Sequence, residues 1–284
     1  MTQQPFSASP GWSFNDSAEV ARSIIEATNA SLRESVRAAY KWSAFPPPEP
    51  IVPLDFFADI QRQRQQRLPQ NWPVNPSPKL WATHAIVQSE GIPLTYVPRP
   101  DIVAAVLAAA NREDRVAILV SRQDEVLEDC DEALTDGLHW CVKDQVPLVR
   151  EAIATYRAGH VAAAQALTVV ACDTLIGANL AYTHASARKV AAKGDLKLAM
   201  LADLLRMELA LAPVVKLLTD WSLASGNPEP TELSRHVTVH HATTAHLRAD
   251  NALIAIMLAT GLICALDELQ GVRGSPVDGS QQFT

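Results

Sequence analysis

The stretch from Leu233 to Glu268 constrains the fold most strongly, because a polar segment leads there directly into a long apolar run. From Ala252 to Leu266 the chain carries no charge and almost no polar group, which is typical of a helix buried in the core. The preceding segment holds Arg235 and four histidines, which are His236, His240, His241 and His246. The sequence therefore predicts a core helix whose entrance is crowded with groups that can carry charge.

The limits of this core helix are predicted from its flanking residues. Asp250 and Asn251 precede the apolar run, where side chains that cap a helix N-terminus are expected. Gly271 follows the run and is expected to end the helix. About 15 apolar residues are fewer than the ~20 that a bilayer-spanning helix needs. We therefore expect a soluble protein with no membrane partner.

Composition favours an all-α fold. The chain of 284 residues is rich in Ala and Leu, only 6% of it is aromatic, and no alternation of strands and helices is visible. The net charge of −7 means that any nucleic acid would have to bind a local basic patch. The four cysteines lack the spacing of a zinc site, and the N-terminus does not resemble a signal peptide. We expect a cytoplasmic protein with neither metal nor cofactor.

Proline-rich connectors organise the N-terminal half. Two segments, Ala44–Pro53 and Leu68–Pro78, are too rich in proline to continue a helix or sheet. We therefore predict a helical bundle preceded by an accessory region of helices and connectors. The expected parts are a disordered tail over 1–16, the accessory region over 17–140, the bundle over 145–270 and a disordered tail over 271–284.

Helical periodicity predicts most of the remaining elements. A short edge strand or an extended loop is expected over 91–100, which contains three prolines. The expected helices cover 17–42, 54–68, 79–89, 102–110, 112–134, 147–157, 161–180 and 185–224, the last one interrupted at Gly194 and Pro213.

Arg235 and His240 are the strongest candidates for chemistry. The usual signatures of nucleotide binding, zinc proteases and serine hydrolases are absent from the sequence. Arginine offers a planar fork that suits phosphate, and histidine can exchange a proton near neutral pH. The two residues are five positions apart, and in a slightly irregular helical segment they can converge on one ligand. Together they could cleave RNA without a metal, because histidine would move a proton while arginine stabilised charge on phosphorus.

A metal site is a weaker interpretation of the same segment. His236 and His240 are four residues apart and would share one face of a helix, as two metal ligands can. No third ligand is placed nearby by the sequence. His241 and His246 are expected to be solvent-exposed or loop residues, and the isolated His184 to be structural or exposed.

The segment resembles the HEPN superfamily, which comprises compact helical domains of prokaryotic defence and toxin systems. Its signature is an arginine, a polar residue, a few variable residues and a histidine beside the last core helix. Arg235, His236 and His240 match these positions, and the apolar helix after them also matches, so that the resemblance covers about Pro147–Gln270. An acidic residue on an earlier buried helix often faces the motif in this family. Asp173 is the candidate here, although many members carry Glu, and Arg235 is its expected partner.

The resemblance implies an endoribonuclease that acts as a homodimer, with two motifs meeting across a two-fold axis. It implies RNA as the substrate, a role in toxin–antitoxin or phage-defence systems, and an antitoxin protein as a further possible partner. The alternative is a non-catalytic RNA-binding or dimeric scaffold module, in which Arg235 pairs with Asp173 for structure and His240 only donates or accepts a hydrogen bond.

A basic stripe is the candidate RNA-binding surface. Lys189, Lys193 and Lys197 recur every four residues, and such a stripe on one helix could follow a phosphate backbone. The competing interpretation is a solvated helix face.

Overall fold

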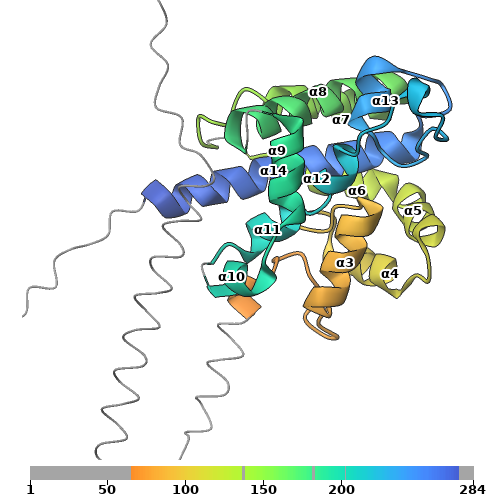
Figure 1. The fold of residues 1–284 in the computed structure, drawn as a ribbon. Coiled ribbons are helices and arrows are strands. Elements are labelled where there is room, and N and C mark those ends of the chain that lie inside the picture. The colour runs from red at the N-terminus through yellow and green to blue at the C-terminus, as the bar shows by residue number, and fades with distance from the viewer. Residues whose placement is uncertain (1–64, 136–137, 181–182, 202, 275–284) are drawn as a thin grey trace, which may run out of the picture. The chain divides into compact units, whose positions relative to one another are not determined.

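The computed structural model describes residues 65–135, 138–180, 183–201 and 203–274, and within these ranges every regular element is a helix (Figure 1). The described part of the chain is therefore all-α, as the composition predicts. The tail expected over 1–16, the helix over 17–42 and the connector over 44–53 lie outside the described residues, as does 275–284.

The helices fall into two groups in chain order. The first group is α3 (Leu80–Glu90), α4 (Pro100–Ala108), α5 (Arg112–Ser121), α6 (Gln123–Ala133), α7 (Val146–Arg157) and α8 (Val161–Asn179). The second group is α9 (His184–Ala192), α10 (Leu196–Leu201), α11 (Leu205–Leu211), α12 (Val214–Leu217), the 3-10 turn η1 (Leu223–Ser225), α13 (Arg235–His240) and α14 (Ala249–Gly274).

Helix α14 is the centre of the core. It packs most extensively on α8 and also contacts α5, α6, α7 and α11. Figure 1 shows α8 on one side of α14 and α5 and α6 on the other. Every residue from Asn251 to Ile263 is buried, which is why this stretch of sequence is apolar all round. The prediction of a core helix entered from a histidine-rich segment is confirmed.

Both limits predicted for this helix are wrong. It begins at Ala249, with the Ala252 N–H donating to the Arg248 carbonyl at 2.9 Å. Asp250 lies in the first turn and pairs with the guanidinium of Arg248. The Asn251 amide is buried and donates to the carbonyls of Thr231 (3.2 Å) and His246 (3.0 Å). The side chains of Asp250 and Asn251 therefore bind the loop that precedes the helix. At its other end the helix continues past Gly271 to Gly274.

Two helices, Val161–Asn179 and Ala249–Gln270, are long and apolar enough to cross a membrane. The length argument from the sequence therefore does not hold for α14. Burial is more informative, because 78% of the apolar stretch in α14 is enclosed by the protein, against 44% in α8. A core helix explains α14 without a bilayer, and the structure is compatible with a soluble protein.

Two of the predicted helices are divided. The helix expected over 112–134 breaks at Arg122, where the backbone is not helical. The Arg122 side chain pairs with Asp101 at 2.7 Å and with Glu125. The long helix expected over 185–224 becomes the four short helices α9 to α12. Its expected interruptions are present, since Gly194 lies between α9 and α10 and Pro213 precedes α12.

The stretch over 91–99 is a buried loop, which decides between the two structures expected there. Ile92, Leu94 and Val97 are fully buried without strand pairing, so the backbone polar groups need side-chain partners. Asn71 supplies them: its amide donates to the carbonyls of Leu94 (3.3 Å) and Pro98 (2.8 Å), and its oxygen accepts from the Tyr96 N–H at 3.0 Å.

Asn71→Ala is expected to destabilise the fold by roughly 2–4 kcal/mol, because it leaves the Tyr96 N–H and the Pro98 carbonyl of this loop without their partner, whereas the Leu94 carbonyl still accepts from Trp72 Nε1. Urea denaturation followed by circular dichroism measures the change. The neighbouring exposed Gln70, replaced by Ala, is the control and should shift stability by less than about 0.5 kcal/mol. A loss as small as that for Asn71→Ala would show that the loop does not depend on this amide.

Candidate functional site

Helix α13 presents the motif because one of its faces is anchored to the core. Ser234 caps it, with the Ser234 hydroxyl accepting from the Val237 N–H at 3.4 Å. Val237 and Thr238 are buried, and the Thr238 hydroxyl accepts from the Gln165 amide of α8 at 3.0 Å. Arg235, His236 and His240 therefore remain on the side of α13 that is not fully buried.

Arg235 and Asp173 form the ion pair expected from the sequence. The Arg235 Nε lies 3.2 Å from Asp173 Oδ1, and Nη2 lies 3.1 Å from Oδ2, so both carboxylate oxygens are held by one guanidinium. The side chains are 18% and 27% exposed. Burial acts to raise the pKa of Asp173, but hydrogen bonds from Arg235 and His184 outweigh it and hold the pKa below the usual range for Asp. The carboxylate is therefore ionised at neutral pH and fixes the guanidinium.

His240 meets the same guanidinium from within α13. Arg235 Nη1 lies 2.9 Å from His240 Nε2, so the two motif residues converge as their spacing predicts. His240 is exposed, and its ring packs edge to face on that of His236 at 5.1 Å between centroids. Arg235 thus bridges a half-buried carboxylate and a solvent-exposed imidazole, which brings together all four predicted catalytic residues.

His184 is a member of this group that the sequence does not reveal. Its Nε2 lies 2.5 Å from Asp173 Oδ1, although the sequence suggested only an isolated structural or exposed histidine. Thr183 caps α9 by accepting from the Ser186 N–H at 3.1 Å, which sets His184 in the first turn facing α8. Thr183 is a sequence signal for the start of α9. The contact of His184 with Asp173, in contrast, depends on the packing of α9 against α8, which the sequence does not show.

The predicted lysine stripe is not continuous. Lys189 lies in α9 and Lys193 caps its C-terminus, whereas Lys197 lies in α10 beyond the break at Gly194. All three side chains are exposed. The prediction that the three lysines share one helix is therefore wrong. Lys189 and Lys193 still lie together at the C-terminal end of α9, the helix that begins with His184.

Of the other two motif-proximal histidines, His246 is a loop residue, which is one of the two structures expected for it, and its side chain is buried. Its Nε2 accepts from the Ser234 N–H at 3.4 Å, and its Nδ1 donates to the Pro230 carbonyl at 3.1 Å. It joins the loop before α14 to the start of α13. His241 packs against the Trp221 ring at 5.4 Å between centroids. Both histidines position α13 and do not extend the motif.

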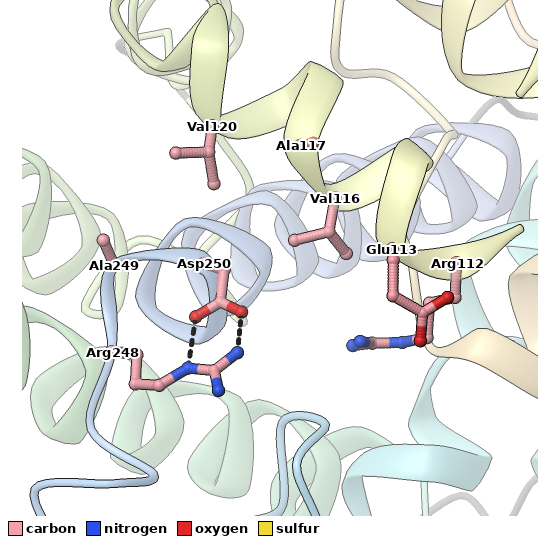
Figure 2. Close-up of a pocket in the computed structure, with 8 residues that line it drawn as sticks. All are labelled: Arg112, Glu113, Val116, Ala117, Val120, Arg248, Ala249 and Asp250. Carbon is pink, nitrogen blue, oxygen red and sulfur yellow. Dashed lines mark hydrogen bonds and ion pairs between the residues drawn. The ribbon is translucent and has the colours of Figure 1, made fainter.

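An open hollow of about 500 Å³ lies elsewhere, between α5 and the start of α14. Figure 2 shows Val116 and Val120 on one wall and the Arg248–Asp250 pair opposite, with Arg112 at one end. None of its lining residues belongs to the group around Arg235. The motif residues therefore lie outside this hollow.

No group of three or more His, Cys, Asp or Glu side chains in the described part of the chain is arranged to hold a metal ion. His236 and His240 contact each other, but the metal-site alternative still lacks its third ligand.

Comparison of the chain with protein-family profiles, with curated protein sequences and with solved structures finds no match.

Proposed function

We propose that the protein is a metal-independent endoribonuclease with a HEPN-like helical bundle over about 145–270. One observation carries the proposal: Arg235 is held by a carboxylate on one side and contacts a solvent-exposed histidine on the other. A structural ion pair needs the carboxylate but not the exposed imidazole. An RNA phosphate, in contrast, needs both a fixed guanidinium and a group that moves protons.

The free donors of Arg235 suit a phosphodiester. A guanidinium has five N–H donors. Two are directed at Asp173 and one at His240, which leaves two for a non-bridging phosphate oxygen. The RNA 2′-hydroxyl can then act as nucleophile while histidine exchanges protons, and Arg235 stabilises the added charge on phosphorus. We expect a 2′,3′-cyclic phosphate and a 5′-hydroxyl as products.

A homodimer is part of this proposal. Val170 on α8 and Val239 on α13 are 51% and 42% exposed, close in sequence to Asp173 and His240 respectively. The half-buried α8 carries no charged residue other than Asp173. A second copy would cover such a face, as the HEPN resemblance implies, and Lys189, Lys193 and Lys197 would contribute to RNA binding. A toxin or phage-defence role, with an antitoxin partner, belongs to the same proposal.

A non-catalytic RNA-binding or scaffold module is the second candidate. It is favoured by the low exposure of Arg235, since a guanidinium that is 18% exposed and bound to both oxygens of Asp173 also stabilises the junction of α8 and α13. In that case the motif would contribute stability alone.

RNA cleavage by the purified full-length protein in EDTA distinguishes the two candidates. His240→Ala is expected to lower the cleavage rate by about 10²–10⁴-fold, because it removes a proton-transfer group. His160→Ala is the control, since His160 is exposed at the other end of α8. Cyclic phosphate ends in the wild-type products would support the ribonuclease. Equal cleavage by wild type and His240→Ala would contradict the catalytic role of His240, whereas no cleavage of varied RNAs by folded wild type would favour the scaffold.

A further inference from the structure

Two histidines lie at opposite ends of one row of hydrogen-bonded side chains. The row runs from His240 to Arg235 (2.9 Å), from Arg235 to Asp173 (3.1 Å) and from Asp173 to His184 (2.5 Å). Its members come from three helices of a single chain, α13, α8 and α9. The His184 side chain is 43% exposed and His240 is exposed, so both rings reach solvent.

The donor and acceptor in each contact follow from the chemical groups. Arginine has only N–H donors, so His240 Nε2 accepts and carries a lone pair. An ionised carboxylate has only acceptors, so His184 Nε2 donates to Asp173. The rings are therefore not equivalent: His240 Nε2 is a proton acceptor, whereas His184 is anchored through its Nε2 to the Asp173 carboxylate.

We infer that His184 is the general acid of the proposed ribonuclease, so that one chain carries both histidines that the reaction requires. The inference rests on the proposed function and deepens it. It differs from the expectation that the acid and the base come from two copies of the motif across a dimer interface. The carboxylate of Asp173 then has two tasks, since it fixes Arg235 for the phosphate and holds His184 in its proton-donating orientation.

The proposed step is balanced in protons and bonds. As the RNA binds, the contact between Arg235 Nη1 and His240 Nε2 opens, and the freed Nε2 takes the proton of the RNA 2′-hydroxyl while the 2′-oxygen forms its bond to phosphorus. The bond from phosphorus to the 5′-oxygen breaks, and that oxygen takes the proton from His184 Nδ1. The products are a 2′,3′-cyclic phosphate and a 5′-hydroxyl, with His240 charged and His184 neutral. Water then restores both protonation states.

His184→Gln separates proton donation from positioning. The glutamine amide can still donate to Asp173, but it has no group that replaces the proton on Nδ1. The test substrate is an RNA oligonucleotide that the wild type cleaves, compared with the same oligonucleotide carrying sulfur in place of the bridging 5′-oxygen at the cleaved linkage. A thiolate leaves without needing a proton, so a general acid matters little for the sulfur substrate.

We expect His184→Gln to lower cleavage of the oxygen substrate by about 10²-fold or more, and of the sulfur substrate by less than about 10-fold. His240→Ala should impair both substrates, because the 2′-hydroxyl still needs a base. His160→Gln is the control for the same substitution at an exposed histidine. Circular dichroism checks folding, and His184→Asn takes the place of His184→Gln if the glutamine variant is not folded.

The outcomes separate this inference from the function on which it rests. If the wild type cleaves and His184→Gln cleaves the oxygen substrate equally well, the role of His184 is overturned while the ribonuclease stands. Equal losses on both substrates by a folded variant would make His184 a positioning residue, and would also overturn the inference. A folded wild type that cleaves no RNA would remove the ribonuclease and the acid together.

Discussion

Arg235→Ala is expected to lower RNA cleavage by about 10³-fold or more, the largest effect among the motif residues. Preorganised donors that stabilise a phosphoryl transition state contribute about 10²–10⁵ to the rate. Arg235 combines this role with contacts to Asp173 and His240, so its removal also releases the residues on both sides. The measurement is single-turnover cleavage of a labelled RNA in EDTA by the full-length chain.

Arg235→Lys is the informative companion variant. Lysine keeps the positive charge but cannot bind both oxygens of Asp173 while also reaching His240. We expect it to recover at most about 10-fold of the activity that Arg235→Ala loses. Arg157→Ala is the control, because Arg157 is exposed at the end of α7. Unchanged cleavage by folded Arg235→Ala, even with lower thermal stability, would contradict catalysis and leave a structural ion pair.

Two contacts of the site could be predicted from the sequence. One joins residues that are close in sequence, and the other involves a charged residue within an apolar helix. Arg235 and His240 share one short helix, so their contact follows from local geometry. Asp173 is the single charge in the apolar α8, and such a charge needs a partner. Its pairing with Arg235 was therefore predictable across 62 positions of sequence. The HEPN type of the bundle remains a proposal.

The parts that could not be predicted depend on tertiary packing. His184 reaches Asp173 only because the start of α9 packs against α8, and no periodicity in the sequence predicts that contact. Asp250 and Asn251 resemble N-cap residues, but Arg248 and the carbonyl of Thr231 engage them instead. In these cases long-range contacts outweigh local preference, which is the usual reason that helix limits are mispredicted.

Glu208→Gln is expected to make the protein more stable at pH 8, by about 3 kcal/mol relative to its effect at pH 4.5. Burial, and then the charge of Asp195, raise the pKa of Glu208 to about 7 from its ordinary 4.5. The Glu208 Oε1 is fully buried with no hydrogen-bond partner among the described residues. It lies against Gly194, where a β-carbon would be only 1.3 Å away, so the backbone closes over the carboxyl group.

The sign follows from where the proton is held. Between pH 4.5 and 7 the folded protein keeps the Glu208 proton while the unfolded chain has lost it, so the free energy of unfolding falls as pH rises through this window. Above pH 7 both states are ionised and the cost is constant. A shift from 4.5 to about 7 corresponds to about 3 kcal/mol at ~1.4 kcal/mol per pKa unit.

Glutamine is similar in size to glutamate and does not ionise, so it removes this cost without opening a cavity. Urea denaturation of the wild type and Glu208→Gln at pH 4.5, 6 and 8 gives the difference directly, because all other titrating groups are common to both chains. The exposed Glu151 on α7, replaced by Gln, is the matched control and should show little dependence on pH. A difference between wild type and Glu208→Gln that stays the same from pH 4.5 to 8 would mean that Glu208 ionises equally in both states. The Glu208 carboxyl group would then be in contact with water in solution, and the backbone at Gly194 would not cover it.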